Sequence, residues 1–161
     1  MNDQATIKVA EPRDAAAILL LGKRLSRESS TVVINSNLTE LTSQFEARQI
    51  KAINQTQTNV IMLAKVGSNL VGIVTVAQVN LAQGELGVAV VKKLWRLGLG
   101  TALVTEAIHW FKTYSSLKSL ILTVEDRNRV AFRLYLKCGF RIYGHITLAH
   151  GLTATQMRLD R

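Results

Sequence analysis

Apolar positions follow two periods along this chain, one typical of strands and one typical of helices. The string TIKVAEP predicts a short strand near the start. Pro12 at the end of that string suits the first turn of a helix, and apolar residues then recur at helical spacing toward Glu28. A second, more polar helix is expected over residues 38–54, capped by Asn37 or Thr39.

The middle of the chain predicts a β-hairpin followed by a central strand. The runs NVIMLAKV and NLVGIVTVAQV are separated only by Gly67 and Ser68, a spacing typical of two strands joined by a tight turn. The run ELGVAVV, at residues 85–91, is apolar almost throughout. Such a run favours a strand buried on both faces, as in a sheet covered by helices.

The second half predicts two helices and three strands. Residues 99–111 carry their apolar side chains on one helical face, and so do residues 128–137. The runs SLILTV, FRIYGHITL and TATQMRL predict strands. The resulting order, β-α-α-β-β-β-α-β-α-β-β, predicts an α/β or α+β fold in which helices pack on a sheet.

Length and composition favour a single domain over residues 1–161. The chain has 161 residues, one proline and no Gly/Ser-rich linker or internal repeat. Its one cysteine, Cys138, excludes an internal disulfide and a cysteine-based zinc cluster, and it suits a reducing compartment. The first long apolar run, residues 15–21, is too short to span a bilayer. We therefore expect a cytoplasmic protein without a membrane partner.

Positive charge is concentrated in one third of the chain. The net charge is +9, from 20 Lys and Arg against 11 Asp and Glu. Residues 92–141 hold ten basic and three acidic side chains, a balance of +7, which leaves +2 for the rest. This distribution predicts that residues 92–141 bind a phosphate group, while a merely solvated basic face stays open as the alternative.

A glycine-containing loop lies between the central strand and the next predicted helix. Gly98 lies just before that helix, and Gly100 lies in its first turn. Without a Cβ, the backbone there can approach an anion closely, and the free N–H groups at the start of the helix can bind the anion. A phosphate loop of the Walker type would need Lys and Ser or Thr where Thr101 and Ala102 stand. A dinucleotide fingerprint would need a small residue at Leu103. The alternative is a helix packed closely on a strand.

Two motifs in order carry a resemblance to a known family. The string WRLGLGTAL followed by N-x-x-A-x-x-L-Y-x-K-x-G-F, which begins at Asn128, resembles the GNAT superfamily of acetyl-CoA-dependent N-acetyltransferases. The resemblance covers residues 70–146 well. It implies a mixed, mostly antiparallel central sheet of six to seven strands flanked by about four helices. It also implies acetyl-CoA as the acetyl donor and no metal. The family loop begins with Gln or Arg, and Trp95 stands there in this chain.

The resemblance also implies roles for individual residues. In this family, one strand diverges from its neighbour and pairs its backbone with the pantetheine arm, and a turn binds the pyrophosphate. An asparagine forms a hydrogen bond near the pantetheine. A tyrosine beside the thioester sulfur acts as general acid. The matching positions are Val88, Ala89 and Val90 for the strand, Arg96, Leu97, Gly98, Leu99, Gly100 and Thr101 for the turn, Asn128 for the asparagine and Tyr135 for the acid.

The general base is assigned less directly. Ribosomal-protein acetyltransferases of this superfamily carry a glutamate five residues before the motif asparagine, where Thr123 stands here. Glu85, at the start of the central strand, is therefore the candidate base, with a solvated glutamate or a water chain as the alternative. We expect Glu125 to lie in solvent or to cap the following helix. The three histidines have no ligand spacing, and Cys138 is expected to be a small core residue.

The resemblance therefore implies an enzyme that transfers the acetyl group from acetyl-CoA to a primary amine of a small molecule or protein, by direct attack in a ternary complex. Two other classes stay open: a non-catalytic acyl-CoA-binding sensor and a basic ribosome-associated or nucleic-acid-associated module. No nucleic-acid motif supports the last, so we do not expect nucleic acid as a partner. A homodimer stays open. The resemblance places the acceptor beside residues 24–54 and 80–84, whose composition does not single out an amine.

Overall fold

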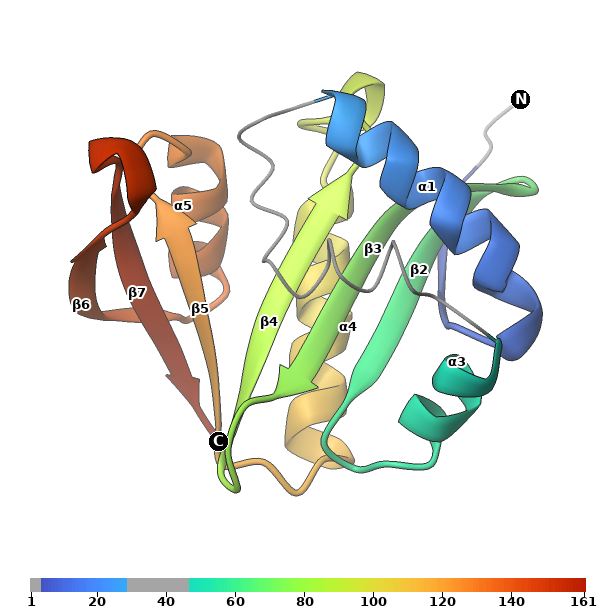
Figure 1. Cartoon of the computed structure of the whole chain (residues 1–161), viewed down its shortest axis with the longest axis horizontal. Coiled ribbons are helices and arrows are strands. Elements are labelled where there is room, and N and C mark those ends of the chain that lie inside the picture. The colour runs from blue at the N-terminus through green and yellow to red at the C-terminus, as the bar shows by residue number, and fades with distance from the viewer. Residues whose placement is uncertain (1–3, 29–46) are drawn as a thin grey trace.

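Seven strands of the computed structural model form one sheet in the order β1-β2-β3-β4-β5-β7-β6 (Figure 1). The structure describes residues 4–28 and 47–161. Every neighbouring pair of strands is antiparallel except β4 and β5, which are parallel. The strands are β1 (Thr6–Val9), β2 (Val60–Val66), β3 (Asn69–Gln78), β4 (Gln83–Val90), β5 (Ser119–Glu125), β6 (Arg141–Thr147) and β7 (Thr153–Asp160).

Helices cover both faces of this sheet. Helices α1 and α3 lie on one face, and α4 and α5 lie on the other (Figure 1). Their bounds are Ala15–Glu28 for α1, Ala47–Asn54 for α3, Leu99–Thr113 for α4 and Arg129–Lys137 for α5. The mixed sheet and its helices confirm the predicted fold class. No helix among the described residues is long and apolar enough to cross a membrane.

The first helix begins as its sequence predicts. Pro12 opens a 3-10 turn that leads directly into α1, and Glu11 and Asp14 form a reciprocal capping box around it. Of the second predicted helix, the described part is α3, which ends at Asn54 as expected. Residues 38–46 and the candidate caps Asn37 and Thr39 lie outside the described residues.

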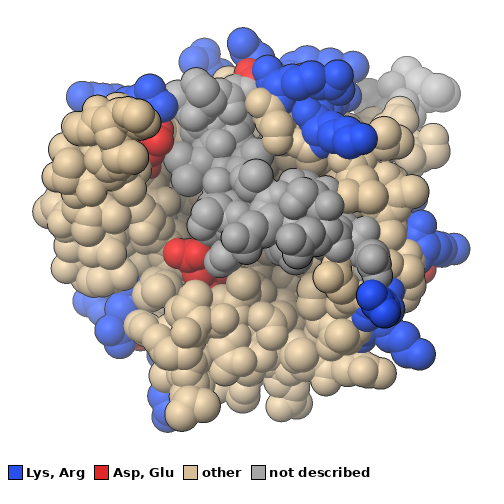
Figure 2. All heavy atoms as spheres, viewed as in Figure 1, with Lys and Arg blue, Asp and Glu red and all other residues tan. Residues whose placement is uncertain are grey.

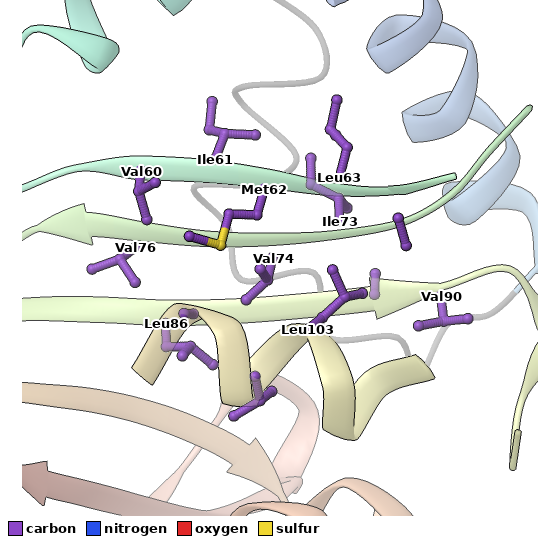
Figure 3. Close-up of a cluster of buried hydrophobic side chains, with 14 of the residues drawn as sticks. Val60, Ile61, Met62, Leu63, Ile73, Val74, Val76, Leu86, Val90 and Leu103 are labelled. Carbon is purple, nitrogen blue, oxygen red and sulfur yellow. The ribbon is translucent and has the colours of Figure 1, made fainter. Parts of the chain in front are cut away.

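Between the sheet and α4 lies a core of branched aliphatic side chains, part of which is drawn in Figure 3. Val74 and Leu103 are fully buried there. Gly72 on β3 allows α4 to approach closely, because a Cβ at this position would stand 2.9 Å from a side-chain carbon of Leu103. Val90 pairs with Gly72, so it shares the face of the sheet that α4 covers.

Strands β4 and β5 are joined at one end only. Their ladder holds three residue pairs, from Gln83 with Ser119 to Glu85 with Ile121, and the strands then separate. Figure 1 shows the two ribbons close together near the C-terminus and far apart at their other ends. Gly84 lies in tight packing at the joined end, where an added Cβ would come within 2.7 Å of a side-chain carbon of Leu117. We call these two ends of the β4–β5 boundary the joined end and the open end.

Arg161 reinforces the joined end from the last strand. Its guanidinium donates hydrogen bonds to the carbonyl oxygens of Ser115 at 2.7 Å, Leu117 at 2.9 Å and Lys112 at 3.1 Å. These carbonyls belong to the end of α4 and the connection to β5. The side chain therefore ties the strand pair β5–β7 to the segment that follows α4.

Candidate functional site

A cavity of about 450 Å³ occupies the open end, where β4 and β5 separate. Its walls come from the end of β4, the loop that follows it, the first turn of α4, the end of β5 and one face of α5. The lining residues are Val88, Ala89, Val90, Leu94, Trp95, Arg96, Gly98, Gly100, Thr101, Thr123, Val124, Asn128, Val130, Ala131, Arg133, Leu134, Tyr135 and Lys137. Segments distant in sequence thus meet around one space.

The loop from Trp95 to Gly98 adopts an unusual backbone conformation. Arg96 has φ 69° and Gly98, the N-cap of α4, has φ 84°, so both lie in the left-handed region. A Cβ at Gly98 would meet no atom within 4 Å, so the backbone angle rather than space favours glycine there. Gly100 differs, because its Cβ would stand 3.1 Å from Leu134 on α5. The first N–H groups of α4 lack helical partners, and this arrangement suits an anion.

The charged residues that line the cavity all carry positive charge. Arg96, Arg133 and Lys137 line it, and none of the described residues in its wall is acidic. Lys92 and Lys93 lie in the short 3-10 helix η2 (Lys92–Leu94) just before the loop, and both are exposed. Figure 2 shows Lys and Arg side chains gathered along the upper edge of the molecule. This field favours an anionic ligand in the cavity.

The backbone of β4 presents hydrogen-bonding groups toward the cavity. The N–H of Val91 donates to the carbonyl of Val71 at 2.9 Å, so odd-numbered residues at this end of β4 bond to β3. Groups alternate along a strand, and the N–H and C=O of Val88 and Val90 therefore point toward β5. Because the β4–β5 ladder stops at Glu85, these groups face the open end instead of a strand.

Tyr135 reaches the cavity from α5. The side chain is only 7% exposed and packs edge-on against Phe140, with ring centroids 5.8 Å apart. Burial raises the pKa of Tyr135 above its ordinary value, and the neighbouring Cys138 raises that pKa further. The phenol therefore stays protonated near neutral pH and can donate a proton or a hydrogen bond.

Two polar residues complete the wall near the start of α5. Asn128 is the N-cap of this helix, and its side-chain oxygen accepts a hydrogen bond from the N–H of Ala131 at 3.2 Å. Asn128 thus lines the cavity and also fixes the first turn of α5. Thr123 lines the cavity from β5.

Three residues predicted for the site lie outside the cavity wall. Leu97 is 69% exposed, and neither it nor Leu99 lines the cavity, although both belong to the loop. Glu85 lies at the last β4–β5 pair, opposite Ile121, and is partly exposed. Since even-numbered residues of β4 share the face that α4 covers, the Glu85 side chain belongs to the face of α1 and α3.

The structure corrects the prediction for Glu125. This residue is only 8% exposed, so it does not lie in solvent, and its carboxylate forms an ion pair with Arg127 at 2.8 Å. The capping oxygen of α5 belongs to Asn128 instead. Burial at the end of β5, together with a basic partner two residues on, keeps the carboxylate away from the helix start.

Several lining residues carried only a weak signal in the sequence. Arg133 and Lys137 lie four residues apart and therefore share one face of α5. Both residues line the cavity. Trp95 departs from the family pattern, so the motif predicted no contact for its side chain. Its indole Nε1–H donates to the carbonyl of Val90 at 2.7 Å, which links the loop to the end of β4.

Comparisons with known proteins find one matching family and many similar folds. The model of the acetyltransferase (GNAT) family matches residues 30–140. Among solved structures, a GNAT-family acetyltransferase from Streptococcus pneumoniae is 26% identical, with a TM-score of 0.84, and the match covers 98% of this chain and 100% of that chain. No curated protein matches the chain.

Two more distant structures share the fold. The ribosomal-protein-S5-alanine acetyltransferase from Vibrio fischeri is 12% identical, with a TM-score of 0.80, over 99% of this chain and 94% of that one. The protein yncA from Salmonella typhimurium, solved with its cofactor acetyl-CoA, is 18% identical, with a TM-score of 0.74, over 98% and 94%.

Proposed function

The chain belongs to the acetyltransferase (GNAT) family, and on that premise we propose that it transfers the acetyl group of acetyl-CoA to a primary amine by direct attack in a ternary complex. The acceptor is an amine of a small molecule or of a protein. The observation that carries this proposal is the cavity at the open end, which joins a strand edge, a helix N-terminus and cationic walls.

Each part of that cavity suits one part of acetyl-CoA. The pantetheine arm carries amides that can pair with the edge of β4 at Val88 and Val90. The pyrophosphate carries negative charge that suits the N–H groups from Arg96 through Thr101. Arg133 and Lys137 on α5 add positive charge on the opposite wall. The cofactor therefore finds backbone donors and acceptors, and a matching electrostatic field, along one continuous surface.

The reaction follows from this placement. The neutral amine attacks the thioester carbonyl, and a backbone N–H from the edge of β4 stabilises the oxyanion that forms. Such donors typically contribute about 2.7–4 kcal/mol. The C–S bond then breaks, and Tyr135 donates its proton to the departing thiolate. The amine loses a proton in the same sequence, so the products are an amide and the free thiol of coenzyme A.

The amine approaches from the opposite face of the sheet. Glu85 lies on the face of α1 and α3, at the last pair before β4 and β5 separate. Beyond that pair the two strands separate, so a carboxylate there lies at the boundary of the open end and can receive the amine proton directly or through water. We therefore assign Glu85 as the general base.

The test combines binding with turnover. Calorimetry should show that the protein binds acetyl-CoA, and a panel of primary amines should then identify an acceptor through release of free thiol. Binding without release of thiol over the whole panel would favour an acyl-CoA sensor instead. Absence of binding at millimolar acetyl-CoA would overturn the proposal.

A further inference from the structure

We propose that Trp95 is a positioning residue that fixes the register in which the pantetheine arm pairs with β4, an inference that rests on the proposed function. The indole Nε1–H donates to the carbonyl oxygen of Val90 at 2.7 Å. Trp95 also lines the cavity, and the residue is 40% exposed. The one polar atom of its side chain is thus bound to the strand edge of the cavity that the residue lines.

The occupied carbonyl limits how a ligand can pair with the strand. Among residues that point toward β5, Val88 and Val90 border the cavity. The Val90 carbonyl already accepts the indole hydrogen and would have to share its oxygen, so Val88 is the favoured acceptor for a ligand amide N–H. A register shifted by two residues would have to compete with Trp95 for the Val90 oxygen. One register is therefore favoured, and it places the thioester at one point along β4.

The same residue also fixes the start of the anion-binding loop. The backbone N–H of Trp95 donates to the carbonyl of Lys92 at 3.1 Å, and the Lys92 ammonium lies 5.9 Å from the centroid of the indole ring. The next residue, Arg96, has the left-handed backbone. Trp95 thus connects the strand edge that pairs with pantetheine to the loop that receives the pyrophosphate, and it sets the distance between them.

The experiment separates these two elements with two ligands. Acetyl-CoA uses both the loop and the strand edge, whereas S-acetylpantetheine lacks the pyrophosphate and nucleotide and can use only the strand edge. We expect Trp95→Phe to weaken calorimetric binding of acetyl-CoA by roughly fivefold, because the loop and the strand edge lose the hydrogen bond that holds them in the binding arrangement. S-acetylpantetheine, measured as a millimolar competitor of acetyl-CoA, should weaken by a similar factor.

Trp110→Phe is the matched control, because Trp110 is buried on α4 and does not line the cavity. Its affinity for both ligands should equal that of the wild type. In this variant Trp95 is the only tryptophan, since the chain has two, and its fluorescence should change when either ligand binds. An emission that S-acetylpantetheine leaves unchanged would contradict contact between the indole and the pantetheine arm.

Trp95→Gln keeps a side-chain N–H donor on an unbranched chain and tests the hydrogen bond itself. We expect it to bind acetyl-CoA more tightly than Trp95→Phe does, with both variants melting cooperatively. If Trp95→Phe does not fold, Trp95→Gln is compared with the wild type instead. An affinity for acetyl-CoA more than about tenfold weaker in Trp95→Gln would show that the side-chain N–H donor does not restore binding. Equal affinities of the two variants would overturn the role of the bond.

The remaining outcomes are equally decisive. If Trp95→Phe weakened the binding of acetyl-CoA but not of S-acetylpantetheine, the indole would serve the loop alone. If S-acetylpantetheine did not compete with acetyl-CoA for the wild-type protein, the strand edge would contribute no measurable binding. Either result overturns the register assignment. Wild-type protein that does not bind acetyl-CoA would instead overturn the proposed function.

Discussion

Strand β4 has two edges, and the fold uses them in opposite ways. Toward β3 the strand pairs along almost its whole length, from Gly84 with Gln78 to Val90 with Gly72. Toward β5 it pairs through three residues only, and beyond Glu85 its groups face a cavity. One edge stabilises the sheet, and the other borders the cavity in which we propose that acetyl-CoA binds. The site therefore depends on an incomplete ladder as much as on reactive side chains.

The sharpest test of this contrast is a change at the open end that affects the reaction and leaves the fold intact. Tyr135→Phe removes the proton donor while keeping the ring that packs against Phe140. We expect kcat to fall on the order of 100-fold, as for loss of a general acid. The Kd for acetyl-CoA, measured by calorimetry, should change by less than about twofold if the hydroxyl acts mainly in the transition state.

The matched control is Tyr143→Phe. Tyr143 is half-exposed on β6, at the edge of the sheet, and does not line the cavity. Its kcat should equal that of the wild type. A Tyr135→Phe variant that keeps its kcat would show that another group protonates the thiolate.

The joined end should behave in the opposite way. Gly84→Ala places a Cβ 2.6 Å from a side-chain carbon of Val76 and 2.7 Å from a side-chain carbon of Leu117. Overpacking of this kind typically lowers the free energy of unfolding by about 1–3 kcal/mol, which urea denaturation measures. Leu81→Ala, at a position 95% exposed, should change it by less than about 0.5 kcal/mol. An unfolding free energy unchanged in Gly84→Ala would show that the joined end is loosely packed.

A smaller effect is expected from the charges at the open end. Arg133→Ala removes a cation from the cavity wall, and we expect coenzyme A to bind about threefold to fivefold more weakly. The loss should shrink as salt is added, because ions screen exposed charges. Arg129→Ala is the control, since Arg129 lies on the same helix but outside the cavity wall. Equal losses in both variants would indicate a general field rather than a local contact.

The smallest expected effect concerns the pH dependence of kcat, which should show no decline in the alkaline range. In the proposed mechanism Tyr135 acts in its protonated form, and burial raises its pKa above the value of about 10 for a free phenol. Its deprotonation is therefore shifted to higher pH, so kcat should stay level from about pH 8 to about pH 10. The measurement is kcat against pH at saturating substrates. A fall centred below about pH 10 that is absent in Tyr135→Phe would contradict the raised pKa.

Most of the secondary structure could be predicted from local pattern. The apolar runs located the strands, and Pro12 with Glu11 and Asp14 marked the start of α1. Strand β4 begins at Gln83 rather than at Glu85, because Gln83 and Val79 already bond across the hairpin despite the polar side chain. Local polarity is a weak guide where backbone pairing continues into a turn.

The site could be predicted only in part. Its glycine loop and the motif helix with Tyr135 lie within short segments, so sequence spacing was sufficient to find them. The environment of Glu125 depends on burial at the end of β5 and on Arg127, which no local pattern reports. The contact between Trp95 and Val90 depends on the turn of the intervening chain. Tertiary contacts of this kind require the structure.

The single short ladder between β4 and β5 also divides the molecule for folding. Strands β1 to β4 pair with sequence neighbours in one half-sheet, and β5, β7 and β6 form the other. The halves share three residue pairs and the hydrogen bonds of Arg161, and side chains from both halves pack into one core cluster. We expect amide hydrogen exchange to resolve two cooperative units that open separately. A ligand spanning β4 and α5 would slow their separation, so acetyl-CoA should merge the two units into one.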